Sequence, residues 1–186
     1  MLKLGLAEEV LVGRLVGKGS RRGSTPFSRF GDFMQRPPAW AGVAGLLALA
    51  GGERGRRAAV RGAGCYLAAA AHLPIKALVG RRHPRGSALH QLGPFTSSFP
   101  SGHAASDLAF MLGAAQEIPL LGLPLSGATM AVHWALVRKR SHYPTDVLAG
   151  GALGIVVALA AWKLFPPRRS TTAEAGQPAE VEVAGT

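Results

Sequence analysis

The chain has 186 residues, which is the length of one compact domain. Of these residues 48% are hydrophobic but only 6% are aromatic, so Ala, Gly, Leu and Val supply most of the apolar surface. Small residues of this kind suit helices that pack closely in lipid. The net charge of +11 would fit a nucleic-acid partner, but the chain has no basic helix with interleaved aromatic residues, which argues against one.

The single cysteine, Cys65, excludes an internal disulfide. It lies in an apolar run and is expected to be a small buried hydrophobic residue. The sequence contains no Cys/His cluster with zinc spacing, so neither a metal nor another cofactor is expected. We also expect no cleaved secretory signal peptide and no lipid anchor.

The N-terminal region comprises residues 1–37. Within it, residues 2–16 carry apolar side chains at helical spacing, interrupted by charges, which predicts an amphipathic helix on the membrane surface or against the bundle. Residues 18–29 are rich in Gly, Ser and Arg, which predicts a flexible basic linker.

Five apolar segments follow, at residues 38–52, 58–80, 101–115, 118–137 and 146–165. A helix needs about 20 residues to cross ~30 Å of hydrocarbon, so the fourth and fifth segments are long enough outright. The third is short, as expected if its N-terminus opens into a polar pocket. The alternative is a water-soluble bundle with buried helices.

No strand pattern stands out. The sequence therefore predicts an all-α fold, an integral-membrane helical bundle with about five transmembrane helices plus the N-terminal amphipathic helix. Residues 38–166 would form the membrane-embedded domain. Residues 167–186 are rich in Pro, Arg, Thr, Glu and Gly, which predicts a disordered tail.

A first polar motif, Pro100-Ser101-Gly102-His103, stands where the third apolar segment begins. Ser101 is a good N-cap, and Gly102 lets a ligand approach the backbone closely. The helix that follows would point unpaired N–H groups and its positive dipole end at an anion. His103 could donate a hydrogen bond or a proton to that anion. The alternative is an ordinary capped helix with an exposed histidine.

A second polar motif precedes the fifth apolar segment. His142 and Asp146 are four residues apart, so they share one helical face if the helix starts early, or a Tyr143–Pro144 turn brings them together. In either arrangement Asp146 could accept the Nδ1 proton and leave Nε2 as a nucleophile. The alternative is an interfacial histidine with a helix-capping aspartate. Together the two motifs favour phosphate chemistry on a lipid.

Basic residues could complete an anion site. Lys76 lies near the end of an apolar segment, where an ammonium group is costly unless it is paired, so it is a functional candidate. Two basic clusters could clamp phosphate oxygens, or could instead bind lipid headgroups. They comprise Arg81, Arg82, His83 and Arg85, and Arg138, Lys139 and Arg140.

Three polar residues lie inside apolar segments. Asp107 follows His103 by four residues, so it could orient His103, or it could contact a neighbouring helix. His72 and His133 are expected to be core or cavity residues rather than catalytic groups.

These motifs resemble those of the type-2 phosphatidic acid phosphatase family, membrane lipid phosphatases related to vanadium haloperoxidases. The family motifs are Lys, six residues, Arg-Pro; then Pro-Ser-Gly-His; then Ser-Arg, five residues, His, three residues, Asp. The resemblance covers residues 39–165. Lys76 and Pro84 fit the first motif, residues 100–103 the second, and His142 with Asp146 the third.

Two departures fall on the phosphate clamp. His83 stands where the first motif has Arg, with Arg82 beside it. Ala135 and Leu136 stand at the Ser-Arg positions of the third motif. Arg138 and Arg140 could substitute there only if the backbone is re-registered. Loss of one such donor can cost roughly 10²–10³ in rate.

The resemblance implies metal-independent hydrolysis of a lipid phosphomonoester or pyrophosphate. His142 would attack phosphorus, Asp146 would stabilise the imidazolium, and His103 would protonate the leaving oxygen and later activate water. Lys76 and Arg82 would hold the phosphate with Ser101 and the Gly102 and His103 amides. The partners implied are a lipid phosphate, such as a phosphatidic-acid-like or polyprenyl lipid, and the bilayer; a homo-oligomer is possible.

The expected location is the plasma membrane, as a multi-pass protein. Family members often face outward, whereas Lys and Arg are more numerous on the side of the motifs, which by the positive-inside rule places the site in the cytoplasm. Because several of these charges could serve phosphate binding, the side that the site faces is left open. Two other functions are compatible with the same residues. One is a weak or inactive family member that binds lipid phosphates. The other is a vanadate-dependent peroxidase, although known members of that group are water-soluble.

Overall fold

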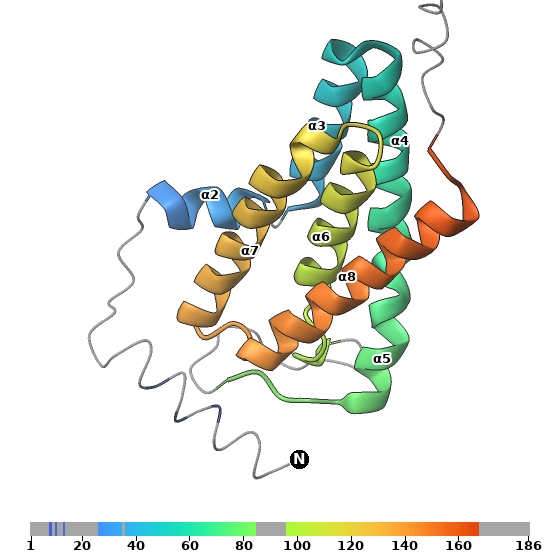
Figure 1. Ribbon diagram of the computed structural model, residues 1–186. Helices are drawn as coiled ribbons and strands as arrows, with labels where there is room; N and C mark the ends of the chain where they lie inside the picture. The colour runs from blue at the N-terminus through green and yellow to red at the C-terminus, as the bar shows by residue number, and fades with distance from the viewer. Residues whose placement is uncertain are drawn as a thin grey trace, which may run out of the picture.

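The computed structural model describes residues 26–34, 36–84 and 96–167, together with residues 8, 10 and 13. Every regular element within these ranges is helical (Figure 1), so the all-α prediction is confirmed for them. The elements are α2 (Pro26–Met34), α3 (Pro37–Ala50), α4 (Gly52–Ala68), η1 (Ala69–Ala71), α5 (His72–Val79), α6 (Gly102–Ala115), η3 (Pro119–Leu121), α7 (Gly122–Arg138) and α8 (Pro144–Leu164).

Helix α6 is the centre of the bundle. It lies between α4 and α7, and α8 crosses over it (Figure 1); its most extensive contacts are with α8 and α4. Ten of its residues are buried, on all sides of the helix. A helix that is apolar around its whole circumference is stable only when other helices cover it. The short third segment of the sequence is therefore the core of the fold.

Small residues let the other helices approach α6 closely. A Cβ on Gly154 of α8 would lie 2.6 Å from the Ala105 carbonyl oxygen, and one on Gly113 would lie 2.7 Å from Cys65 Sγ of α4. Any larger side chain would push the helices apart, as in other small-residue contacts between membrane helices. Cys65 is 2% exposed, as predicted for a buried hydrophobic residue.

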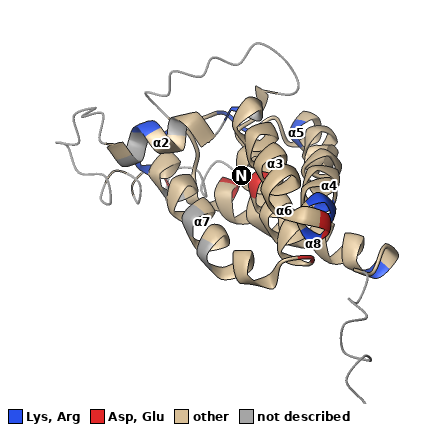
Figure 2. Cartoon of the chain, turned by 90° about the horizontal axis from the view of Figure 1, so that it is seen from above, with Lys and Arg blue, Asp and Glu red and all other residues tan. Residues whose placement is uncertain are grey.

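Three stretches of the described chain are long and apolar enough to cross a membrane: Gly52–Val79, Pro119–Arg138 and Pro144–Leu164. The expected number of about five is therefore not confirmed, because Pro38–Ala50 and α6 are too short. Charged residues are sparse on the drawn helices (Figure 2). On α8, Leu148, Val156 and Trp162 are more than half exposed, which suits a lipid-facing surface.

The two ends of the bundle differ in character. At one end the last turn of α5, the start of α6, the end of α7 and the start of α8 lie together, as predicted from the order of the motifs. At the other end Arg57 and Arg61 of α4 form ion pairs of 3.1 and 3.0 Å with Glu117. The first end contains the candidate active site.

The N-terminal predictions are tested only in part. Glu8, Val10 and Gly13 are helical, and Glu8 is buried while the other two are exposed; the rest of the expected amphipathic helix lies outside the described residues. Residues 26–29, expected in the flexible linker, belong to α2 instead, because Pro26 can start a helix whose apolar face packs on α7. The expected tail from residue 168 onward also lies outside the described residues.

Candidate active site

A cavity of about 370 Å³ opens at the motif-bearing end of the bundle. Four imidazoles and one ammonium group reach it, and none of its described lining residues is a carboxylate. The lining residues are Tyr66, His72, Leu73, Lys76, His83, Thr96, Gly102, His103, Ser106 and His142. An anionic group is therefore the ligand that this lining suits.

The N-terminus of α6 forms one wall of this cavity. Ser101 is the N-cap, and its Oγ accepts a hydrogen bond of 3.4 Å from the Ala104 amide, as the sequence predicts. The Ser101 amide donates to the Asp146 carbonyl oxygen at 2.9 Å and so ties the start of α6 to α8. His103 lies in the first turn and lines the cavity. The helix start and His103 thus face the same space.

His142 comes from the turn between α7 and α8. Its Nδ1 lies 3.1 Å from the Ser98 carbonyl oxygen, and a carbonyl can only accept a hydrogen bond. Nδ1 therefore carries the proton of the neutral ring, and Nε2 keeps its lone pair. This differs from the expected bond to Asp146, whose Oδ2 is 3.8 Å from Nδ1. The backbone of residue 98 sets the tautomer, and the carboxylate stands close behind it.

Asp146 is fully buried and serves the turn as well as the histidine. Helix α8 begins at Pro144, so His142 lies outside the helix, and the Tyr143–Pro144 turn brings the two residues together. The Tyr143 amide donates to Asp146 Oδ2 at 2.9 Å, which makes Asp146 a capping residue of α8. Asp146 therefore caps α8, as the alternative interpretation predicted, and also lies close to His142.

Arg81 was not singled out by the sequence. Its guanidinium donates 2.8 Å hydrogen bonds to Asp146 Oδ1 and Thr145 Oγ1, and it also pairs with Glu8. The group stacks over the Tyr143 ring, 4.1 Å from the centroid. Arg81 thereby neutralises Asp146 and fixes the turn that presents His142. Its position five residues after Lys76 gave no signal, because the neighbouring arginines were equivalent in the sequence.

Lys76 and His83 lie beside the two histidines. Lys76 Nζ is within 2.5 Å of the Ser97 carbonyl oxygen, and the residue is 9% exposed. His83 contacts two carbonyl oxygens, those of Ser141 at 2.7 Å and Thr96 at 3.1 Å, and its ring centroid is 5.3 Å from that of His142. Burial lowers the pKa of His83, and the nearby Lys76 charge acts in the same direction.

No set of three His, Cys, Asp or Glu side chains that could hold a metal ion occurs among the described residues. The described part of the site is an arrangement of four imidazoles, one ammonium group and a helix N-terminus around a single space. Such an arrangement can bind a phosphate and transfer it.

Comparison with known proteins agrees with this geometry. The profile of the PAP2 superfamily matches residues 58–170, which include every described residue lining the cavity. The chain belongs to the PAP2 superfamily.

Two similar relatives are named as phosphatases. The decaprenylphosphoryl-5-phosphoribose phosphatase of Mycobacterium tuberculosis is 38% identical over 122 residues, which are 63% of this chain and 67% of the relative. The protein of the same name from Mycolicibacterium smegmatis is 34% identical over 134 residues, 71% of this chain and 72% of the relative. No solved structure matches the chain. The family and the three long apolar helices indicate a membrane protein.

The missing PAP2 arginines are not replaced inside the cavity by the residues that the sequence suggested. Arg82 and Arg138 are exposed, and neither they nor Arg140 is among the lining residues. Their assignment as phosphate ligands stays a prediction that this arrangement does not support. Leu136, at the motif arginine position, is 3% exposed and belongs to the core.

Arg140 lies in the turn that ends α7, which explains why it does not line the cavity. Its φ is 60°, in the left-handed region. The Arg140 amide donates to the Val137 carbonyl at 2.9 Å and the Ser141 amide to the Leu136 carbonyl at 3.0 Å. This is a Schellman turn, in which the left-handed position usually holds Gly. Sequence reasoning missed the turn because an arginine occupies that position.

His72 lines this PAP2 cavity, which is one of the two places that the sequence analysis expected for it. It begins α5, four residues before Lys76, and lines the cavity rather than the apolar core. The space that Gly102 leaves open is taken by its ring: a Cβ on Gly102 would lie 2.6 Å from His72 Nε2. The helical spacing of His72 and Lys76 was the signal that could have placed His72 in the cavity rather than in the core.

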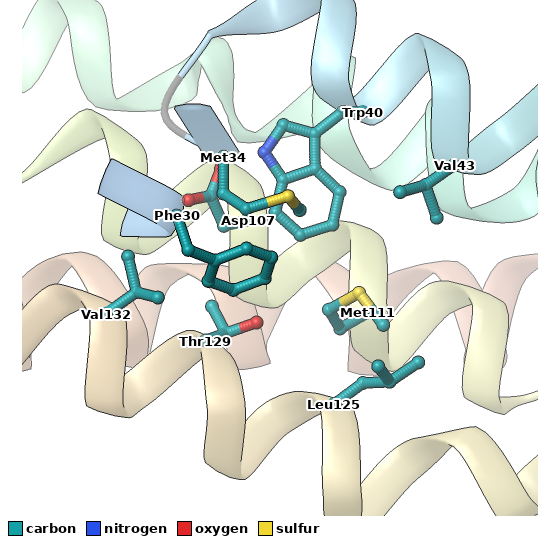
Figure 3. A pocket seen from close by; sticks show the side chains of 9 residues that line it. All are labelled: Phe30, Met34, Trp40, Val43, Asp107, Met111, Leu125, Thr129 and Val132. Atoms are coloured by element: carbon teal, nitrogen blue, oxygen red, sulfur yellow. The ribbon is translucent and has the colours of Figure 1, made fainter. Parts of the chain in front are cut away.

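Asp107 does not orient His103. It points into a second, smaller cavity of about 80 Å³ between α2, α3, α6 and α7 (Figure 3). Its Oδ2 accepts a 3.0 Å hydrogen bond from His133 Nε2. Three neighbouring atoms have no hydrogen-bond partner among the described residues: Asp107 Oδ1, His133 Nδ1 and Trp40 Nε1. The alternative expectation, a contact to a neighbouring helix, is therefore confirmed.

Proposed function

We propose that this chain is a membrane lipid phosphatase that hydrolyses a phosphate ester or pyrophosphate of a lipid through a phosphohistidine intermediate. One observation carries the proposal: His103 of α6 and His142 of the turn between α7 and α8 line a single cavity beside the N-terminus of α6. A phosphate held there would have an acid on one side and a nucleophile on the other.

The reaction has two steps. His142 Nε2 donates its lone pair to phosphorus while the bond to the lipid oxygen breaks, and His103 gives that oxygen its proton. His103 then takes a proton from water, whose oxygen attacks phosphorus and displaces His142, releasing inorganic phosphate. Ser98 and the nearby Asp146 support the positive charge that His142 carries in the intermediate.

Electrostatic groups hold the transferred phosphoryl group. The transition state of phosphoryl transfer is loose, so the protein contributes mainly positioning and charge stabilisation. Lys76 supplies a full positive charge, and the Gly102 and His103 amides supply the positive end of α6. Ser101 shapes that end as its cap. The reaction needs no metal in this scheme.

The names of the relatives support a substrate class. Both are named for a polyprenyl phosphate sugar that carries a second phosphate. We propose a polyprenyl-linked phosphate of this kind as the substrate and the plasma membrane as the location. The apolar flanks of α4 and α8 would contact the lipid tail.

The test is phosphate release by purified protein in detergent, with EDTA present, from several lipid phosphates. We expect turnover by the wild type and none by His142→Ala at equal folded fraction. Turnover that survives His142→Ala would contradict the phosphohistidine step, and turnover lost only on adding EDTA would contradict the metal-free scheme.

A second candidate function is lipid-phosphate binding without turnover. The observation that favours it is the burial of Leu136, which leaves the third motif without its arginine. Lipid phosphate bound tightly by the wild type, with no release above that of His142→Ala on any substrate, would select this candidate.

A further inference from the structure

His72 presents a hydrogen-bond acceptor to the cavity. Its Nδ1 lies 2.7 Å from the Ala69 carbonyl oxygen, which can only accept, so in the neutral ring the proton is on Nδ1. Nε2 then has a lone pair, and among the described residues it has no hydrogen-bond partner. A lone pair that faces a polar cavity requires a donor from water or from a ligand.

This acceptor lies beside the helix end at which the phosphate is proposed to bind. His72 Nε2 packs against Gly102, the residue that precedes His103 at the start of α6. A substrate whose phosphate lies at this helix end would place the atoms next to its phosphate ester within reach of Nε2. With the phosphate held at this helix end, His72 would lie beside the group attached to it.

The remaining lining suits a hydroxylated group. Tyr66, Thr96 and Ser106 contribute hydroxyl groups, whereas Leu73 is the one aliphatic side chain among the described lining residues. A diacylated glycerol phosphate has no hydroxyl beside its phosphate and would leave Nε2 without a donor. A sugar phosphate with a hydroxyl one or two carbons from its phosphate-bearing carbon, or a lipid with a free hydroxyl beside that carbon, would supply one.

We propose that His72 is a specificity-determining residue whose Nε2 accepts a hydrogen bond from a substrate hydroxyl one or two carbons away from the phosphate-bearing carbon. The inference rests on the proposed phosphatase function and narrows its substrate to lipids with a hydroxylated group beside the phosphate. It assigns a role to a residue outside the three motifs.

The experiment uses two lipids that differ only in one hydroxyl group. The first is a monoacylated glycerol 3-phosphate with a free hydroxyl at carbon 2, and the second carries hydrogen in place of that hydroxyl. We expect the wild type in detergent to prefer the first by roughly tenfold in kcat/KM, the worth of one well-placed hydrogen bond. His72→Phe, which keeps a planar ring but has no acceptor, should hydrolyse both equally.

The preference is a ratio, so the amount of folded protein cancels. A merely structural role for His72 would lower both rates together and leave the ratio unchanged. His72→Gln keeps an acceptor and should keep most of the preference, so it serves if His72→Phe does not fold. Leu73→Ala, on the same cavity wall but without a polar atom, is the matched control and should retain the full preference.

The outcomes separate the two proposals. Hydrolysis of both lipids by the wild type at equal kcat/KM, or a preference that persists in His72→Phe, would overturn the role of His72 and leave the phosphatase intact. If the wild type releases no phosphate from either lipid or from a polyprenyl phosphate, the proposed function fails, and the inference fails with it.

Discussion

Two histidine–aspartate pairs occur among the described residues, one inside the bundle and one at its end. His133 and Asp107 are both buried to within 1% exposure and make a direct 3.0 Å hydrogen bond. His142 and Asp146 stand 3.8 Å apart, and the histidine bonds to a backbone carbonyl instead. The shorter contact thus belongs to the pair that lies outside the candidate active site.

The difference shows that contact between an imidazole and a carboxylate does not identify the reactive pair. What distinguishes the pair at the end of the bundle is its surroundings. Arg81 and the Tyr143 amide satisfy Asp146, and the ring of His142 lines a cavity shared with Lys76 and His103. The interior pair has no counter-ion, and it leaves one oxygen and one nitrogen unpaired among the described residues.

The largest effect is expected from a comparison of two histidine substitutions. His103→Asn should lower kcat by about 10²–10⁴, the usual contribution of a general acid and base, with little change in unfolding temperature. His133→Asn should do the reverse, lowering the unfolding temperature while the folded fraction keeps its kcat. Phosphate release and thermal unfolding in detergent measure the two.

A loss of kcat in His133→Asn equal to that in His103→Asn would break the comparison. The interior pair would then belong to the reaction, and the cavity at the end of the bundle would not define the site.

The second expected effect concerns the counter-ion that only one pair has. Arg81→Met should lower kcat by about tenfold to a hundredfold, because Asp146 loses its charge-assisted hydrogen bond and the Tyr143 turn loosens. Arg81→Lys keeps the charge but not the planar fork, so an intermediate rate is expected.

Glu8→Gln is the control for this series. It leaves Arg81 paired with Asp146, so its effect on kcat should be smaller than that of Arg81→Met. Equal effects of the two substitutions would show that the N-terminal contact, and not the pairing with Asp146, positions the turn.

The sequence predicted the parts of this structure that depend on local pattern. The apolar segments, the cap at Ser101 and the gathering of His103 and His142 at one end all follow from periodicity and from the order of the motifs. The number of long apolar helices was not predicted correctly. Helix α6 is short and covered on all sides by other helices, and in the sequence such a helix resembles a truncated membrane span.

Tertiary choices among equivalent residues were beyond prediction. Arg81 and Arg82 are neighbours of the same type, yet one pairs with Asp146 and the other is exposed. Asp107 could contact His103, one turn away on α6, or a histidine on another helix. Only the packing of α7 on α6 selects His133. Single-chain spacing carries no information on either choice.

A third effect is expected on stability alone. Asp107→Leu and His133→Leu should each lower the free energy of unfolding by about 1–3 kcal/mol, because the remaining partner is left buried without its hydrogen bond. The double substitution should cost less than the two single costs added together, since no unpaired group remains. Denaturation in mixed detergent measures the three values. Strict additivity would contradict a direct energetic link between the two side chains.

The smallest effect is expected at the turn that carries the chain from His133 on α7 to His142. Arg140 occupies a left-handed position with a φ of 60°, where Gly avoids the steric cost. Arg140→Gly should therefore raise the free energy of unfolding by about 0.5–1 kcal/mol.

Gly80→Ala is the matched control and should lower the free energy of unfolding. Gly80 has a φ of 58°, and an added Cβ meets nothing within 4 Å there, so the substitution tests only the backbone. A fall in kcat/KM of a hundredfold in Arg140→Gly would instead identify Arg140 as a phosphate ligand, since its side chain would then be needed in the cavity that its turn position keeps it from lining.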